Sequence, residues 1–334
     1  MENNTPFKNK NILVTGGTGL IGIPLVNKLA RLGGAVTAVS LDGASPFDKS
    51  VAFVRADLCE PDVCDRLMAG RDVVFHLAGI KGSIGVAKTR AATFLIKNLL
   101  MNTLVMEAAR KANVQKFLFA SSICIYPPAR VFEEKDAFTA LPDASDRFGA
   151  MSKLIGEMQI ETYGLQYGLK NFFIARPANT YGPFDNFNPA SALVIPGLIY
   201  RIFSGENPLR IWGDGAAIRD FVFCDDVAEA MVRMIIQNKV GPFNIGSGRP
   251  VAIKDLVGII VESAQKSVGK KINVEWDASK PSGEKFRVTS IDRIKQETGW
   301  EPAVGLEEGI FQTIDWYEHN KSSLLQRFSI LSEE

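Results

Sequence analysis

The stretch Val14-Thr15-Gly16-Gly17-Thr18-Gly19-Leu20-Ile21-Gly22 joins a short apolar segment to an amphipathic one, and it organises the first half of the chain. We expect residues 11–15 to form a strand and the following helix to run to about Leu32. The glycines permit a tight turn and a close approach to a pyrophosphate, whose charge is favoured at a helix N-terminus. Between a strand and a helix, this pattern predicts a dinucleotide site. The residues assigned to it are Gly16, Gly19, Leu20, Ile21 and Gly22.

Outward from this turn, apolar segments alternate with helical patterns. Nearly continuous apolar strands separated by helices indicate a parallel sheet that is covered on both faces. The predicted fold is therefore α/β, a doubly wound parallel Rossmann sheet with ligands at the carboxyl ends of its strands. The predicted strands are 11–15, 35–40, 51–56, 73–77, 116–121 and 171–176, and the predicted long helices are 91–112 and 150–167.

After Pro177, prolines and glycines become frequent and the strand–helix rhythm loosens. This change predicts a smaller, mixed C-terminal substrate domain over the carboxyl edge of the sheet. We expect residues 8–178 with about 220–249 to form the Rossmann domain. The smaller domain is expected to take about 179–219 with 250–318, and 319–334 is expected to be a polar tail.

The net charge is only +1, which argues against a nucleic-acid-binding surface. No apolar run reaches the roughly 18–20 residues of a membrane span, and the first ten residues lack the apolar core of a signal peptide. The four cysteines are scattered along the chain, as is typical of a protein in a reducing compartment. With only two histidines, the sequence argues against a metal site built from Cys and His. These features predict a cytoplasmic protein without nucleic-acid, membrane or metal partners.

The end of the second predicted strand bears on the choice of cofactor. Asp42 lies about twenty residues past Gly22, where a carboxylate would bond a ribose 2′-hydroxyl and repel a 2′-phosphate. The strand could instead end at Ser40 without an acid, and Lys49 is the nearest base that follows. We favour NAD, and NADP stays open.

The spacing Gly16-x-x-Gly19-x-x-Gly22 resembles the extended short-chain dehydrogenase/reductase family of NAD-dependent epimerases and dehydratases, over about residues 8–316. The resemblance implies that Asp57 and Leu58 contact the adenine. It also implies that the strand end Leu77-Ala78-Gly79 and the helix residue Asn98 line the cofactor. A homodimer through the two long predicted helices is a further implication.

The resemblance also implies a nucleotide-sugar substrate. Asn179 and Arg219 match positions that reach the diphosphate, and Arg287 is a second phosphate candidate. A guanidinium suits this task because its donors bind phosphate oxygens in pairs. Four stretches are most similar to GDP-fucose synthase-like members of the family, so we favour a GDP-linked, manno-configured sugar and leave UDP- or CDP-sugars open. These stretches are 76–82, 122–127, 182–189 and 276–281.

The family pairs a catalytic Tyr with a Lys four residues later on one helix face, and this chain keeps only the Lys. Lys153 matches it and Ser122 matches the family's Ser or Thr, whereas Gly149 stands in place of the Tyr. Phe148 could take the position of the Tyr only if one extra residue were inserted in the helix, and its side chain has no hydroxyl. Two tyrosines expected near the strand ends, Tyr126 and Tyr181, are interpreted as wall residues.

Two further departures narrow the expected reaction. Cys124 matches the Cys of members that epimerise through Cys and His, but Leu193 occupies the His position. Cys124 stays a candidate catalytic acid, although a small buried Cys is the commoner case. Ile123 and Cys124 follow Ser122 where dehydratases carry Asp-Glu. We therefore expect an oxidoreductase or epimerase acting at the sugar C4, with Ser122, Lys153 or an ordered water moving the proton. The alternatives are a UDP-sugar 4-epimerase, or a binding protein that has lost catalysis.

Overall fold

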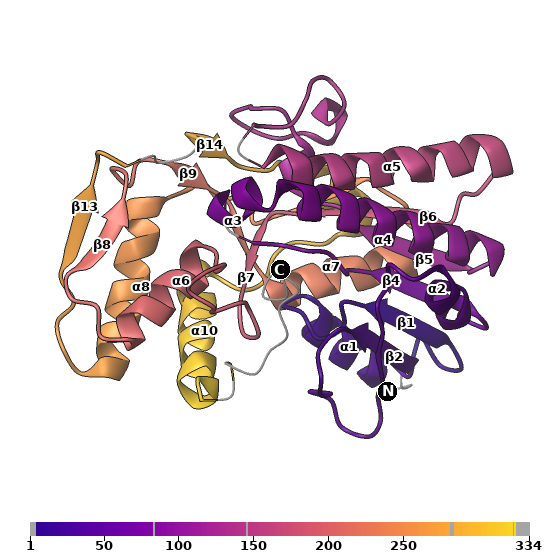
Figure 1. Ribbon diagram of the computed structural model, residues 1–334, viewed down its shortest axis with the longest axis horizontal. Coiled ribbons are helices and arrows are strands. Elements are labelled where there is room, and N and C mark those ends of the chain that lie inside the picture. Colours follow the sequence, from indigo (N-terminus) through magenta and orange to yellow (C-terminus); the bar gives the residue numbers. More distant parts are fainter. Residues whose placement is uncertain (1–4, 83, 145, 281–283, 323, 325–334) are drawn as a thin grey trace.

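The structure is a computed structural model that describes residues 5–82, 84–144, 146–280, 284–322 and 324. Its centre is a seven-stranded parallel sheet in the order β11-β6-β5-β4-β1-β2-β3 (Figure 1). The chain winds outward from β1 to β3 and then crosses back to β4 on the other side of β1, which confirms the predicted doubly wound fold. The strands are β1 (Asn11–Thr15), β2 (Ala35–Ser40), β3 (Ala52–Arg55), β4 (Val73–His76), β5 (Lys116–Ala120), β6 (Phe172–Pro177) and β11 (Phe243–Ile245).

Successive strand residues face opposite sides of the sheet, and each side carries its own helical layer. On one side, Leu13, Phe117 and Phe119 are buried in a cluster with residues of the covering helices. Burial of such side chains supplies the main stabilisation of the layer, about 1.5–3 kcal/mol for each large one. The helices on this side are α2 (Pro61–Met68), α4 (Ala91–Lys111) and α5 (Arg147–Tyr167).

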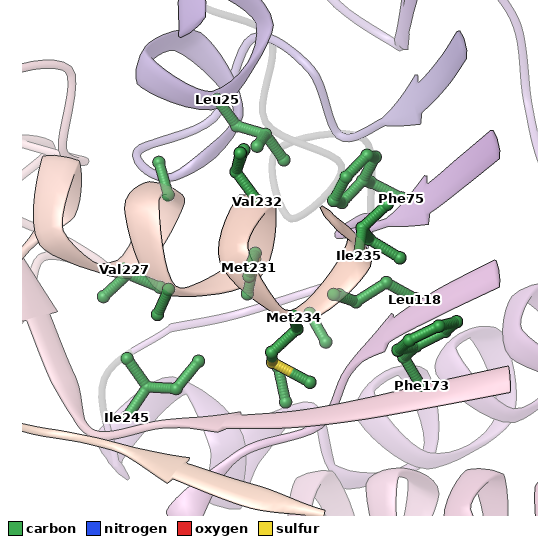
Figure 2. Close-up of a cluster of buried hydrophobic side chains, with 14 of the residues drawn as sticks. Leu25, Phe75, Leu118, Phe173, Val227, Met231, Val232, Met234, Ile235 and Ile245 are labelled. Atoms are coloured by element: carbon green, nitrogen blue, oxygen red, sulfur yellow. The ribbon is translucent and has the colours of Figure 1, made fainter. Parts of the chain in front are cut away.

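On the other side, α1 (Gly22–Arg31) and α7 (Cys224–Ile236) pack against each other and against the sheet. Figure 2 shows side chains of α7, among them Val232 and Ile235, gathered with Leu25 of α1 and with Phe75 and Leu118 of the sheet. In the sequence, α7 follows residues 179–219, which we expect in the smaller domain. Its packing therefore returns the chain to the large sheet.

A second core lies in the part of the molecule drawn on the left of Figure 1. It is built mainly from apolar faces of three helices, and a two-stranded pair and a three-stranded sheet lie beside them. β7 and β10 form a further parallel pair. The elements are β7 (Asn179–Tyr181), α6 (Val194–Phe203), β8 (Leu209–Trp212), β9 (Ile218–Arg219), β10 (Phe221–Phe223), β12 (Val251–Ala252), α8 (Ile253–Val268), β13 (Val274–Asp277), β14 (Phe286–Arg287) and α10 (Leu306–Asn320).

Three details differ from the sequence expectations. Ile294 of α9 (Asp292–Thr298) and Trp300 pack in the α7 core of the large sheet rather than in the smaller part, and the Trp300 indole donates to the Asp226 carbonyl at 3.1 Å. The expected tail at 319–334 begins inside α10, which continues to Asn320; residues 323 and 325–334 lie outside the described residues. α5 begins at Arg147 instead of 150, so Gly149 lies in its first turn.

Over the described ranges, no helix has the length and apolarity that crossing a membrane requires. The described residues likewise contain no group of three or more His, Cys, Asp or Glu side chains placed to hold a metal ion.

Candidate active site

The glycine turn between β1 and α1 needs its glycines for geometric reasons. Gly16 has a φ of +66°, and a Cβ there would lie 2.8 Å from the Ala78 backbone nitrogen. A Cβ at Gly22 would collide with the Gly16 carbonyl oxygen. The turn therefore brings the N-terminus of α1 against the strand end at Ala78. Gly19 is exposed there, and its amide donates to the Gly16 carbonyl at 3.0 Å.

The ribose end of the expected cofactor site lies after β2. The strand ends at Ser40, whose hydroxyl accepts from the Thr18 hydroxyl at 2.7 Å and from the Asp42 amide at 3.1 Å. Asp42 is half-buried, two residues beyond the strand. Arg55, at the end of β3, donates from Nε to the Leu41 carbonyl at 3.1 Å. Along the loop the sequence offers Lys49 as the nearest base, whereas Arg55 reaches this loop from the neighbouring strand.

Past β3, the two residues expected at the adenine separate. Asp57 is exposed and accepts a hydrogen bond from the Cys59 amide at 2.8 Å, whereas Leu58 is buried in the core under α2 and α4.

Leu20 and Ile21 of the glycine turn pack against two different cores. Leu20 contacts the core of the smaller part, and Ile21 contacts the core around α1 and α7. The turn thus joins both parts of the molecule.

At the nicotinamide end, Gly79 follows β4 and leaves room beside Lys153. A Cβ at Gly79 would lie 3.5 Å from Lys153 Nζ and 3.6 Å from Asn98 Oδ1. Asn98 holds the loop by accepting from the Ile80 amide at 2.8 Å. Together with the glycine turn, this open position beside Leu77 and Ala78 fits a bound dinucleotide.

Lys153 and Ser122 approach the same end of the sheet. Lys153 Nζ donates to the Ala120 carbonyl at 2.8 Å and lies 4.9 Å from the Phe119 ring centroid. Burial lowers the pKa of Lys153 to about 8. Ser122 caps the short 3₁₀ helix η1 (Ile123–Ile125), because its hydroxyl accepts from the Cys124 amide at 3.2 Å.

Neither Cys124 nor His76 is set up as a base. Burial, and then the nearby charge of Asp146, raise the pKa of the Cys124 thiol to about 12, so it is protonated near neutral pH. The fully buried His76 ring lies between the Thr15 hydroxyl at 2.7 Å and Asn102 Oδ1 at 3.0 Å. Burial, and then the Lys153 charge, lower its pKa to about 3, so the ring is neutral and structural.

The two tyrosines expected near the strand ends, Tyr126 and Tyr181, are buried. The Tyr126 hydroxyl donates to Asn244 Oδ1 at 2.6 Å and accepts from Arg176 Nη1 at 2.8 Å. The Tyr181 hydroxyl points to the Leu306 carbonyl at 3.4 Å. Burial raises the pKa of both phenols. Both hydroxyls are therefore committed to the interior.

The position of the absent tyrosine is not filled by Phe148. α5 is a regular α-helix from Arg147 onward, so no inserted residue shifts the register, and the Phe148 side chain is 47% exposed. Instead, a Cβ at Gly149 would lie 3.2 Å from Oδ1 of Asp146, the residue that precedes the helix. The spacing between the family's Tyr and Lys does not point to Asp146, because this residue precedes the helix.

The expected phosphate-binding residues meet where β9 and β14 pair. Arg219 and Arg287 are register partners, and burial and then the Arg287 charge lower the pKa of Arg219. Arg287 Nε lies 2.5 Å from Glu284 Oε2, and Arg219 Nη1 donates to the Glu284 carbonyl at 2.7 Å. Asn179 Nδ2 donates to the Asp220 carbonyl at 2.7 Å. The neighbouring motif residues 281–283 lie outside the described residues.

A cavity of about 420 Å³ opens beside Arg219 in the smaller part of the molecule. Leu193, which we expect at the position of the family's His, lines it with an apolar side chain, so the cavity wall offers no imidazole there. The cavity also brings Asn179 together with Arg219. Its lining further includes Arg201, Ile211, Trp212, Phe221 and Ile253.

Residues 12–246 match the model of the NAD dependent epimerase/dehydratase family. A probable GDP-L-fucose synthase 1 from Oryza sativa subsp. japonica is 32% identical over 325 residues, which cover 94% of this chain and 93% of that protein. Two solved structures are similar across both parts of the chain. An epimerase from Methanothermobacter thermautotrophicus has a TM-score of 0.85 at 25% identity and covers 98% of this chain and 97% of its own. A UDP-glucose 4-epimerase from Thermus thermophilus, in complex with NAD, has a TM-score of 0.77 at 28% identity, with 92% and 99% covered.

Proposed function

The chain belongs to the NAD dependent epimerase/dehydratase family, and on that premise we propose that it is an oxidoreductase or epimerase acting at C4 of a nucleotide-linked sugar, with GDP as the favoured nucleotide. In this proposal the cofactor is NAD, held by the glycine turn, Asp42, the strand end at Ala78, and Lys153. The diphosphate is held by Arg219 and Arg287.

One observation carries the proposal: an arginine pair borders the cavity, and one of the two lies within electrostatic range of the residues around Lys153. Burial raises the pKa of the Cys124 thiol, and the charges of Arg287 and Lys153 both oppose this rise. Arg287 is also the register partner of Arg219, which lines the cavity. A nucleotide in the cavity with its diphosphate on the two arginines would therefore extend its sugar toward Lys153.

Each end of this path supplies a distinct part of the chemistry. When bound, the nicotinamide accepts a hydride from the sugar carbon or returns it. Lys153, charged near neutral pH and half-buried beside Gly79, would orient the ribose and favour negative charge near the reacting hydroxyl. The Ser122 hydroxyl, held at the η1 cap, would position the sugar hydroxyl.

The site disfavours the family's longer reactions. Dehydration by the Asp-Glu route lacks its acids, because Ile123 and Cys124 follow Ser122 in η1. Epimerisation through Cys and His lacks the imidazole, because Leu193 lines the cavity instead. Oxidation or reduction at one carbon needs neither, so it is the reaction that the residues present support best.

The choice of nucleotide rests on two kinds of likeness. The rice relative is named for a GDP-sugar, and the four stretches quoted above are similar to the GDP-fucose synthase-like enzymes. The Thermus thermophilus neighbour is named for UDP-glucose. We favour GDP because the sequence likeness includes residues 182–189, and Pro189 lines the cavity. A UDP-sugar 4-epimerase is the alternative.

The test incubates the full chain with NAD, NADH, NADP or NADPH and a panel of GDP- and UDP-sugars, including 4-keto forms. Nicotinamide absorbance would follow net oxidation or reduction, and product NMR would detect epimerisation, which leaves absorbance unchanged. Turnover confined to GDP-sugars supports the proposal in full. Turnover confined to UDP-sugars would contradict the preference for GDP and support the alternative, a UDP-sugar 4-epimerase.

Gly149 supports a second candidate, a nucleotide-sugar-binding protein without catalysis. It predicts that NAD and a nucleotide sugar bind while no member of the panel turns over. Under this candidate Lys153→Met would leave sugar binding unchanged. Activity that Lys153→Met abolishes would exclude it.

A further inference from the structure

The site contains an acid that the family's tyrosine motif does not include. Asp146 stands immediately before α5, and its carboxylate approaches Gly149, the residue at the tyrosine position. A Cβ at Gly149 would lie 3.2 Å from Asp146 Oδ1, so this oxygen borders the space in which the missing side chain would begin. A Cβ on Gly149 would next meet Phe94, 3.7 Å away.

Asp146 does not perform the usual task of an aspartate at this place. An Asp before a helix commonly accepts a hydrogen bond from an amide of the first turn. Asp146 is the N-cap residue of α5, but its side chain makes no such bond. The carboxylate is half-buried and therefore available to another group that enters beside Gly149.

The electrostatic neighbours of Asp146 are those of the proposed reaction site. Burial, and then the Asp146 charge, raise the pKa of the Cys124 thiol, whereas the charges of Arg287 and Lys153 oppose this rise, so each of the three groups lies within electrostatic range of Cys124. Burial raises the pKa of the Asp146 carboxyl, Arg287 opposes this rise, and Asp143 adds to it. A carboxyl whose pKa is raised in this way takes a proton more readily than an exposed one.

The other ionisable groups near the strand ends are less suited to accept a proton. The Cys124 thiol has a pKa raised to about 12, and the Lys153 amine is mainly charged at neutral pH with a pKa of about 8. His76 is buried between Thr15 and Asn102. The tyrosines at 126 and 181 face the interior, as described above.

We propose that Asp146 is the catalytic acid–base of this enzyme and takes the place of the family's tyrosine. This assignment rests on the proposed function. In oxidation, the Asp146 carboxylate would take the proton of the sugar hydroxyl as the C–O bond becomes C=O, and a bound oxidised nicotinamide would be the hydride acceptor that balances the step. In reduction, the protonated Asp146 would return the proton to the oxygen, with a bound reduced nicotinamide as the hydride donor to the carbon.

The experiment compares the full chain with Asp146→Asn, which keeps the shape and removes the charge. Asp62→Asn in α2 makes the same chemical change on an exposed residue far along the chain. We expect Asp146→Asn to lower kcat by about 100- to 10,000-fold, the usual range for general acid–base groups, with the Kd of NAD and of the nucleotide sugar within about threefold. Asp62→Asn should behave as the unsubstituted chain does.

The pH profile separates proton transfer from helix capping. For oxidation, kcat should rise with pH as the Asp146 carboxyl loses its proton, at a pH that its neighbours Arg287, Asp143 and Cys124 influence. In Asp146→Asn this rise of kcat with pH should be absent. If Asp146 had a purely structural role, Asp146→Asn would lower the midpoint of thermal unfolding and leave kcat and its rise with pH unchanged. The double variant Asp146→Ala with Gly149→Tyr restores the family's phenol, and it should recover turnover relative to Asp146→Ala alone.

The outcomes distinguish this assignment from the proposed function. If the unsubstituted chain turns over a nucleotide sugar and Asp146→Asn does so equally well, the assignment of Asp146 fails alone. A loss of kcat accompanied by an equal loss of binding would also overturn it. If the unsubstituted chain turns over no member of the panel, the proposed function fails, and the role of Asp146 fails with it.

Discussion

Arg219 and Arg287 are direct register partners in the parallel pair β9–β14, and burial and then the charge of Arg287 lower the pKa of Arg219. Two like charges side by side are unfavourable unless an anion joins them. Only one carboxylate, that of Glu284, is paired with either guanidinium among the described ion pairs, and it contacts Arg287. The pair therefore retains positive charge toward the cavity, as a diphosphate site would require.

From this relationship we expect Arg219→Gln to weaken binding of the nucleotide sugar by about 10- to 100-fold. This range corresponds to the roughly 1.5–3 kcal/mol of a hydrogen bond to a charged group. Isothermal titration calorimetry with a GDP-sugar would measure it, and binding should weaken further as salt is added. Arg66→Gln, on the exposed side of α2, is the matched control. Equal affinities in the two variants would contradict the assignment of Arg219.

The second prediction concerns the choice between NAD and NADP at the end of β2. Asp42 should repel a 2′-phosphate, while Arg55, which contacts the Leu41 carbonyl, should attract one. We expect NAD to bind more tightly than NADP, and Asp42→Ala to narrow the difference by about tenfold, or about 1.4 kcal/mol. Arg55→Ala should weaken NADP alone.

Fluorescence titration of both cofactors against the three proteins would check the expectation. A clear preference for NADP in the unsubstituted chain, lost in Arg55→Ala, would show that Arg55 rather than Asp42 governs this end of the site.

The third prediction uses the lowered pKa of Lys153. Its folded-state pKa of about 8 lies below the ordinary 10.5, so burial of the charged amine costs stability below pH 8. Between about pH 8 and 10.5 the unfolded chain binds more protons, and this cost disappears as pH rises. We therefore expect Lys153→Met to raise the free energy of unfolding by about 1–2 kcal/mol at pH 7 while abolishing turnover.

Denaturant unfolding of both proteins from pH 6.5 to 10.5 would test this. The stabilisation in Lys153→Met should shrink above pH 8, because the unsubstituted Lys153 then loses its charge in the folded state. A constant difference across the range would mean that the pKa of Lys153 is not lowered, and a destabilised variant at pH 7 would mean that its bond to the Ala120 carbonyl outweighs the burial cost.

The strands could be predicted from local sequence patterns, whereas the site depends on contacts between residues that are far apart in the sequence. The β1 strand and the glycine turn were placed correctly because an apolar run and a glycine spacing are local signals, visible within about ten residues. The packing of Trp300 on Asp226 was missed because residues 74 positions apart in sequence carry no joint pattern. The expected placement of Ile294 and Trp300 in the smaller domain differs from the structure for the same reason, whereas the other domain boundaries and the roles of the individual site residues stay predictions.

Two site residues illustrate the limit further. Arg55 reaches the loop after β2 because parallel strands place residues of β3 beside those of β2, as in the pair Ser40 and Arg55. Asp146 reaches Gly149 because α5 begins at Arg147, three residues earlier than the apolar pattern indicated. Both depend on where an element ends, and element boundaries are the least reliable part of a sequence-based prediction.

The last prediction tests the contact between Asp146 and Gly149 with a single methyl group. Gly149→Ala should raise the free energy of unfolding by about 0.5 kcal/mol, because alanine favours the helical state more than glycine does. Its Cβ, 3.2 Å from Asp146 Oδ1, should also push that carboxylate aside by a few tenths of an ångström and reduce kcat several-fold. Gly164→Ala lies in the same helix, where a Cβ would have only an ordinary contact at 3.5 Å with the Leu169 carbonyl. It should give a similar stabilisation with unchanged kcat. Equal kcat in both variants would argue that Asp146 does not act on the substrate.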